Sequence, residues 1–374
     1  MNQPKEEPKE GASAAGSAVF IKEAAAWDRF VSGSEKPHIM QSWAWAELKA
    51  KSGWRPHRLL IERRGGARVG VSVLERDFPK IGRRFFYAPR GPVVATGWRP
   101  EDLEQLFLEL AGLAKNRRAV FLKMDPDVSL EQDWISSDLR GAGFVPATGG
   151  GGFAGVQPRC VFRLKIGASE EELLKNMDQK TRYNIRLAGK KGVTVRPVSD
   201  RAEIETFHRI LIETGQRDGF MVRPLRYFND IQDLMGPRGQ AQYFLAELGG
   251  KALAGALALR FGPVCWYAYG ASSNEGRQHM PNHLMQWTMI RWAKSQGCGL
   301  YDFRAVPDDP NPQNPLYGLY RFKKGFGGDL VRFVGEFDKV YSPWWYRMWA
   351  YGWPVYKSVR KFMRGPARKA GRNE

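Results

Sequence analysis

The order of helix-like and strand-like segments recurs in the two halves of the chain, and this recurrence limits the possible folds more than any other feature. Apolar residues at three- and four-residue spacing indicate helices, and alternating apolar residues indicate strands. In the first half we expect helices at 22–33, 40–54 and 100–118, and strands within 57–78, 83–94 and 119–128. In the second half we expect helices at 201–219, 225–236 and 281–297, and strands at 193–199, 241–250, 251–262, 264–272 and 300–306. Residue identity between the halves is weak, but the shared order predicts an internal duplication.

Mixed helices and strands in this order predict an α/β fold of layers in two similar domains, which face each other across a cleft. A chain of 374 residues suits two domains. The boundaries we expect are a disordered tail over 1–18, a first domain over 19–160, a second over 161–343 and a distinct segment over 344–374. The last part of the second domain is able to pack back on the first. Glycines at 149–152 mark a flexible break.

The net charge of +19 indicates a polyanionic partner, either nucleic acid or an anionic membrane surface. A generally basic surface without a partner is the competing interpretation. The three cysteines, Cys160, Cys265 and Cys298, lie far apart and predict buried free thiols in a reducing compartment. Neither the cysteines nor the histidines have a spacing typical of a metal site, and we expect none. The sequence shows no signal peptide and no apolar run that would span a membrane, so we expect a cytoplasmic protein.

The segment 344–374 has a composition of its own. Its aromatic residues are followed by a run of cations, and both prefer the headgroup layer of an anionic membrane. We expect contact with the membrane surface, and a helix packed on the protein body is the alternative. The residues concerned are Trp344, Trp345, Tyr346, Trp349, Tyr351, Trp353 and Tyr356, then Lys357, Arg360, Lys361, Arg364, Arg368, Lys369 and Arg372.

A single basic helix is expected over 169–192, with Ser169 in a capping position and Glu172 three residues later. Arg182, Arg186 and Lys190 follow one another at four-residue spacing and therefore share one face of this helix. A stripe of cations suits the backbone of a nucleic acid, and a solvated surface is the usual alternative.

Ten strings occur in the order typical of one family, and together they cover about residues 19–345. They are MQSWAWAELK, YAPRGPVV, KMDPDV, KTRYNIRLAGKKGV, VRPLRYF, WYAYGASS, PNHLMQWTMIRWAKSQG, YDFRAV, LYRFKKGFGG and VGEFDKV. In these strings the chain resembles the FemABX family of non-ribosomal peptidyltransferases, in its compact FemX form without a coiled-coil arm.

The resemblance implies two GNAT-like domains, the first binding a peptidoglycan precursor. It also implies that aminoacyl-tRNA is the donor. This donor is a co-substrate, and no cofactor is expected. The amino acid, glycine, alanine or serine, is transferred to the side-chain amine of residue three of the stem peptide. The acceptor would be lipid II or UDP-MurNAc-pentapeptide, so that the protein works in the cytoplasm or peripherally on the inner face of the plasma membrane. A monomer is favoured.

Residue by residue, the resemblance assigns Lys49, Arg223, Tyr227 and Tyr269 to precursor binding. Lys49 and Arg223 are suited to a pyrophosphate or carboxylate. Tyr269 is expected to share one strand face with Tyr267. A tyrosine that precedes the Asp-Pro pair in the family is replaced here by Val120 or its neighbour, so the fine preference for the precursor stays open.

The resemblance also assigns Phe322 and Lys323, within RFKKGF, to the tRNA end and to charge stabilisation at the reacting ester. If this segment is extended, Lys323 and Lys324 point in opposite directions, and at most one of them enters the cleft. Asp125 and Glu336 are the matching carboxylates, which would accept or orient the proton of the attacking amine. A structural ion pair is the other interpretation of each, and Asp302 is expected to pair with Arg304 or another basic residue.

Two further functions are compatible with the composition. A GNAT enzyme that uses acyl-CoA would carry a glycine-rich loop at a helix start, and GRQHMPNH at 276–283 lacks the later glycines. A non-catalytic RNA or membrane adaptor would keep the basic surface without gathering Lys49 and Lys323 at one cleft.

Overall fold

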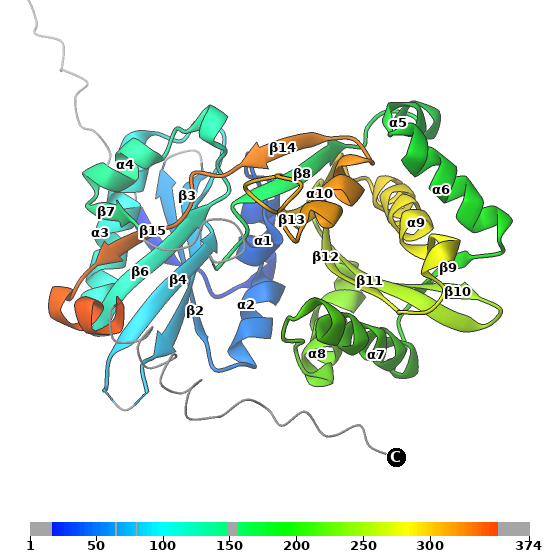
Figure 1. Cartoon of the computed structure of the whole chain (residues 1–374). Coiled ribbons are helices and arrows are strands. Elements are labelled where there is room, and N and C mark those ends of the chain that lie inside the picture. The colour runs from blue at the N-terminus through cyan, green and yellow to red at the C-terminus, as the bar shows by residue number, and fades with distance from the viewer. Residues whose placement is uncertain (1–16, 64–65, 80, 148–155, 351–374) are drawn as a thin grey trace, which may run out of the picture.

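The structure is a computed structural model that describes residues 17–63, 66–79, 81–147 and 156–350. Two lobes lie side by side, each built on a mixed sheet with helices on its faces (Figure 1). The strands of lobe 1 are β1 (Ser17–Phe20), β2 (Arg55–Arg63), β3 (Gly66–Asp77), β4 (Arg84–Arg90), β5 (Val93–Val94), β6 (Ala119–Pro126), β7 (Phe144–Pro146) and β15 (Phe337–Val340). Its helices are α1 (Ala24–Ser32), α2 (Trp43–Ala50), α3 (Pro100–Asn116) and α4 (Ser136–Gly141).

Lobe 2 holds the central part of the chain. Its strands are β8 (Cys160–Lys165), β9 (Thr194–Val198), β10 (Ala241–Leu248), β11 (Lys251–Phe261), β12 (Val264–Ser272), β13 (Leu300–Val306) and β14 (Asp329–Arg332). Its helices are α5 (Glu170–Asn176), α6 (Gln179–Lys190), α7 (Arg201–Asp218), α8 (Leu225–Met235), α9 (Pro281–Ser295) and α10 (Tyr317–Lys324). None of the described helices combines the length and the apolarity needed to cross a bilayer.

The two sheets share one topology. Lobe 1 has the strand order β1-β2-β3-β4-β6-β15-β7, and lobe 2 has β9-β10-β11-β12-β13-β8-β14. In each lobe a parallel pair, β4 with β6 or β12 with β13, is joined by one helix, α3 or α9. The remaining pairings along both orders are antiparallel. The predicted α/β fold with two similar domains is therefore confirmed.

Lobe 1 is completed by a strand from the end of the chain. The strands of lobe 2 come from one stretch of chain, from β8 to β14, and β8 pairs with β13 and β14. β15 follows β14 along the chain but lies in lobe 1, between β6 and β7, which is the position that β8 holds in lobe 2. Lobe 1 is thus built from two separate stretches of chain, whereas lobe 2 is contiguous.

A common hydrophobic core also joins the lobes. Trp45 and Leu48 of α2 belong to the same buried cluster as Phe228 of α8 and Trp266 of β12. Arg163 of β8 reinforces the contact because it pairs with Asp127, which follows β6, at 2.8 Å and with Asp302 of β13 at 3.0 Å. Asp302 therefore pairs with a nearby basic residue, as expected. Despite burial, Arg163 keeps the pKa of Asp127 down at about 2.

Three local expectations need correction. The basic helix is broken into α5 and α6, because Asp178 starts a new helix and its amide donates to the carbonyl of Gly325. The tail is shorter than predicted, since β1 begins at Ser17 and pairs with β2. The segment around Lys323 and Lys324 forms the helix α10 and is not extended.

The glycines at 149–152, residues 1–16 and residues 351–374 lie outside the described residues. The three cysteines, which we expected to be buried free thiols, are all buried and free.

Candidate functional site

Three cavities lie where the lobes meet. The largest of the three, of about 460 Å³, reaches from α2 and α8 across the sheet of lobe 1. A smaller one, of about 160 Å³, lies deeper between the lobes, and a third of about 260 Å³ lies beside β15. We call them the aromatic cavity, the deep cavity and the carboxylate cavity. Gln157, in the segment that links the lobes, lines all three.

The four residues assigned to precursor binding come together here, although they lie far apart in the sequence. Lys49 on α2 donates to the hydroxyl of Tyr227 on α8 at 3.3 Å. The Lys49 amine also lies 4.3 Å from the centre of the Trp45 ring, and the Arg223 guanidinium lies 5.6 Å from the Tyr227 ring. Lys49, Arg223 and Tyr227 line both the aromatic and the deep cavity, and Tyr269 lines the deep cavity.

Local structure explains how these side chains are held. Ser42 caps α2 by accepting from the amide of Trp45, and Lys49 in the last turn then lies at the lobe boundary. Pro224 precedes α8, which leaves Arg223 just outside the helix, while Tyr227 lies in the first turn and is buried.

The described linings of the aromatic and deep cavities contain five cations, of which Lys123 pairs with Glu336 and Asp338 outside the lining. No Asp or Glu is among the described residues that line either one. Burial, and then the charge of Arg223, lowers the pKa of Lys49 to about 8. Burial likewise lowers the pKa of Arg304. The cations of the two linings are Lys49, Arg76, Lys123, Arg223 and Arg304. A bound anion would offset the mutual repulsion that disfavours these charges.

Two indole groups in the deep cavity point to a ligand as well. Trp45 and Trp266 both line it, and both are buried. Within the described part of the chain neither indole N–H has a hydrogen-bond acceptor. Buried donors are normally satisfied, so an acceptor atom is expected to enter this cavity.

Two arginines reach the site from unusual backbone conformations. Arg90 has φ of 57° and Arg304 has φ of 62°, which is the left-handed region that costs free energy for residues other than glycine. Arg304 lines the deep cavity and donates to the side chain of Gln157 at 3.0 Å. Arg90 lines the carboxylate cavity and donates to the carbonyl of Pro158 at 2.6 Å.

The two candidate carboxylates, Asp125 and Glu336, both line the carboxylate cavity. Asp125 accepts from the Tyr87 hydroxyl and from the Arg90 amide, each at 2.7 Å. Burial raises the pKa of Asp125 to about 6, although Arg90 opposes the shift. Glu336 pairs with Lys123 at 3.0 Å, as a structural ion pair would.

Lys323 does not lie at the mouth of the cleft, contrary to the expectation. Its side chain is buried, and its amine donates to the carbonyl of Ala305 at 2.8 Å. Ala305 follows Arg304, so Lys323 lies behind the wall of the deep cavity and lines none of the three cavities. Burial lowers its pKa to about 7, with a contribution from Arg304 and with Asp302 opposing. Lys324 is exposed, as the helix requires for a residue next to a buried one.

Phe322 packs against protein side chains. Its ring lies 5.1 Å from the His283 ring and 5.3 Å from the Phe326 ring, both edge-on. The assignment of Phe322 to the tRNA end stays a prediction.

The expected common face of Tyr267 and Tyr269 is wrong. Leu257 pairs with Tyr269 and Ala258 pairs with Tyr267, so Ala268 forms a bulge in β12. A bulge reverses the alternation of side chains. Tyr267 therefore packs on the core beneath α9, while Tyr269 turns towards α8 and the deep cavity.

The basic stripe on α6 is divided. Arg182 donates to the carbonyls of Lys175 and Met177 at the end of α5, so its guanidinium has a structural role. Arg186 and Lys190 are exposed and remain candidates for a tRNA backbone. Tyr183, which is 60% exposed, lies between them and Lys180.

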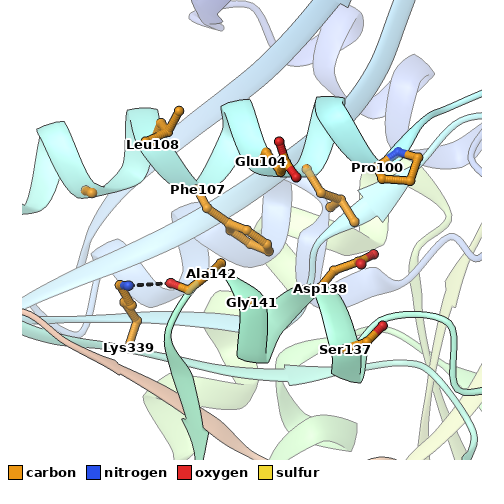
Figure 2. A pocket seen from close by; sticks show the side chains of 11 residues that line it. Pro100, Glu104, Phe107, Leu108, Ser137, Asp138, Gly141, Ala142 and Lys339 are labelled. Atoms are coloured by element: carbon orange, nitrogen blue, oxygen red, sulfur yellow. Dashed lines mark hydrogen bonds between the residues drawn. The ribbon is translucent and has the colours of Figure 1, made fainter.

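A further cavity, of about 480 Å³, lies on lobe 1 between α3 and α4 (Figure 2). Phe107 and Glu104 of α3 face Asp138 and Gly141 of α4, and Lys339 donates to the carbonyl of Ala142. None of the predicted site residues lines it. No group of His, Cys, Asp or Glu among the described residues could hold a metal ion.

Sequence reasoning missed Gln157 and Arg304 as site residues. Arg304 lies within YDFRAV, one of the strings that carry the family resemblance, so a signal existed. Gln157 follows the glycine-rich link, and no pattern in the sequence marks it.

Two sheets of this topology define a tandem GNAT-like fold. A tandem GNAT protein of clavulanic acid biosynthesis shares the fold, with a TM-score of 0.51 and 10% identity. A solved structure of FemX is much more similar: its TM-score is 0.82 at 28% identity, with 89% of this chain and 99% of that chain covered.

The FemAB family model matches residues 23–251 and 237–351, so the chain belongs to the FemAB family. It is 30% identical to the lipid II:glycine glycyltransferases of Staphylococcus aureus strains MRSA252 and USA300, over 84% of this chain and 90% of each relative. The predicted family and the predicted class of enzyme, an aminoacyltransferase, are confirmed.

Proposed function

We propose that this chain transfers glycine, alanine or serine from aminoacyl-tRNA to the side-chain amine of the third residue of a peptidoglycan stem peptide, on a precursor carried by lipid. Membership of the FemAB family supports this function. The names of the glycyltransferases from Staphylococcus aureus, which specify lipid II, support the lipid-linked acceptor. The site of action is then the inner face of the plasma membrane.

The observation that carries the proposal is the convergence of Lys49, Arg223 and Arg304 on cavities whose described lining has no carboxylate. Such a surface suits the pyrophosphate of the precursor, with Arg223 able to hold two oxygens at once. The buried indole N–H of Trp45 supplies a further donor.

The reaction itself is the aminolysis of an ester. The acceptor amine attacks the aminoacyl carbonyl carbon, the C–N bond forms, and the C–O bond to the tRNA ribose breaks. The amine proton ends on the departing ribose oxygen. Asp125 and Glu336, in the carboxylate cavity, orient the acceptor ammonium, and the Asp125 carboxylate accepts its first proton and later releases it to water. Arg186 and Lys190 bind the tRNA backbone, which makes the affinity strongly dependent on salt.

An acyl-CoA donor is disfavoured by the helix starts. The helices that follow the parallel strands, α3 and α9, both begin with proline, at Pro100 and Pro281. Proline has no backbone N–H, so each helix lacks its first amide donor for a pyrophosphate.

A transfer assay tests the proposal. The full chain is mixed with glycyl-, alanyl- or seryl-tRNA and with lipid II or UDP-MurNAc-pentapeptide, carrying lysine or diaminopimelate at position three. Mass spectrometry should show the acceptor gaining one amino acid residue. A gain seen only with acetyl-CoA would identify an ordinary acyltransferase, and no gain with any donor would favour the adaptor. Lys49→Ala should reduce transfer, and Lys51→Ala is its control because Lys51 pairs with Asp230 and lines neither cavity.

A further inference from the structure

We infer that the aromatic cavity binds the first isoprene units of a polyprenyl diphosphate, with the diphosphate at Lys49 and Arg223. This inference rests on the proposed function, because it names the part of the acceptor that the cavity receives. It divides the aromatic cavity into a cationic end and an apolar end.

The two ends belong to one continuous cavity of about 460 Å³. Lys49, Arg223 and Tyr227 lie at the cationic end, beside the deep cavity. Trp54, Leu74, Phe85, Phe121 and Trp349 line the apolar end, where Arg76 lies with its guanidinium 5.2 Å from the Trp54 ring. A chain linked to a diphosphate held at Lys49 would therefore leave along these rings.

The rings at the apolar end form a packed wall. Phe85 and Phe121 lie 5.7 Å apart and nearly parallel, at 17°, and Trp54 meets Phe85 edge-on at 5.4 Å. The Trp349 ring lies 4.7 Å from the Phe121 ring. Such a surface offers hydrocarbon contact to a branched isoprenoid chain.

The lining also argues against a nucleoside in the same place. A uracil ring that loses water needs hydrogen-bond partners for its amide edge, and unpaired polar atoms are costly to bury. The described lining of this cavity contains no Asp, Asn or Glu. Among the rings, the Tyr87 hydroxyl already donates to Asp125 at 2.7 Å, and Gln157 belongs to the lobe link.

The apolar end leads to a surface suited to the membrane. Trp349 belongs to a helix over 343–350, shown in red in Figure 1. On the same helix Trp344 is 62% exposed and Met348 is 48% exposed. The Arg83 guanidinium lies 5.6 Å from the Trp345 ring of this helix. Exposed apolar side chains beside cations are typical of a surface that enters the headgroup layer, from which a lipid can reach the cavity.

Binding of farnesyl diphosphate, inorganic pyrophosphate and UDP to the full chain tests the inference without tRNA or turnover. Farnesyl diphosphate should bind at least about tenfold more tightly than either other ligand, because burying two methylene groups already provides that factor. Trp349→Ala should remove most of this advantage and leave the affinity for pyrophosphate unchanged. Lys49→Ala should weaken all three ligands.

Trp344→Ala is the matched control, since this exposed tryptophan of the same helix does not line the cavity. In detergent-free solution it should bind farnesyl diphosphate as the wild type does. UDP binding as tightly as farnesyl diphosphate, or Trp349→Ala weakening UDP and farnesyl diphosphate equally, would overturn the inference.

The transfer assay separates the two ideas. With both precursors as acceptors, Trp349→Ala should lower kcat/KM for the lipid-linked one at least about tenfold and leave the UDP-linked one unchanged. An equal effect on both, or none, refutes the lipid subsite while transfer itself stands. If the wild type transfers no amino acid to either precursor, the proposed function is refuted, whatever the result with farnesyl diphosphate.

Discussion

The side-chain amine of Lys323 donates a 2.8 Å hydrogen bond to the backbone carbonyl of Ala305, the residue that follows Arg304. Lys323 thereby supports the strained segment that carries Arg304 into the deep cavity. Its amine is buried behind this wall, and the contact links α10 to β13 directly below the site.

Burial of Lys323 predicts a dependence of stability on pH. Its pKa falls from 10.5 to about 7 on folding, so the unfolded state binds more protons between these values. The free energy of unfolding therefore rises with pH over this window. Lys323→Met removes this titrating amine and with it the rise. The free energy of unfolding of the variant minus that of the wild type should therefore be highest at pH 7 and decline towards pH 10.

Urea denaturation at pH 7, 8.5 and 10 measures this difference. Lys324→Met, at the exposed neighbouring position, should keep the pH dependence of the wild type. A difference between Lys323→Met and wild type that stays constant with pH would contradict the prediction.

The pKa of Lys49 predicts how anion binding responds to pH. Because burial and Arg223 lower this pKa to about 8, the free protein loses the Lys49 charge as the pH rises through 8. Affinity for pyrophosphate should therefore fall between pH 7 and pH 9. Lys49→Arg should bind with little change over this range, since guanidinium stays protonated. Calorimetry at pH 7 and pH 9 measures the affinity of both proteins for pyrophosphate. An equal fall in the affinity of Lys49→Arg would contradict the prediction.

Asp125 predicts the acidic side of the transfer rate profile. With a pKa of about 6, its carboxylate forms as the pH rises through 6, and kcat/KM should rise with it. The hydrogen bond from Tyr87 favours the carboxylate, so Tyr87→Phe should move this rise to higher pH. Asp125→Asn should give a lower rate without the rise. A profile that Tyr87→Phe leaves in place would show that another group titrates.

The Asp127–Arg163 pair predicts strong coupling between the lobes. Asp127→Ala leaves Arg163 buried with only Asp302 as its partner, and breaking a buried pair in this way costs about 3 kcal/mol. Denaturation should show this loss of stability. Lys251→Ala, which breaks an exposed pair with Glu275, should change the stability little. Equal effects of both variants would mean that the buried pair contributes no more than a surface one.

The position of β15 predicts that lobe 1 depends on the end of the chain. A chain that stops after Gly335 lacks β15, which leaves β6 and β7 without the strand that lies between them. Hydrogen exchange should show lost protection in β6 and β7, or the shortened protein should fail to fold. A chain that stops after Ala350 keeps β15 and should retain protection. Unchanged protection in the shorter chain would show that β15 is dispensable.

Much of this protein could be predicted from its sequence, because the predicted features are local or depend on ordered motifs. Apolar periodicity located α1, α3, α7 and α9 and the hairpin of β2 and β3. Strings spread over the whole chain identified the family and the residues at Lys49, Arg223, Tyr227 and Tyr269.

Tertiary structure alone decided the rest. A bulge at Ala268 separated Tyr267 from Tyr269, and α10 formed where the sequence allowed a strand, because packing partners far along the chain determine both. The return of β15 to lobe 1 depends on the gap between β6 and β7 that it fills. The burial of Lys323 arises when α10 packs against β13, and the cation-lined cavities arise where the two lobes meet. Desolvation and repulsion are properties of these assembled surfaces and not of any one segment.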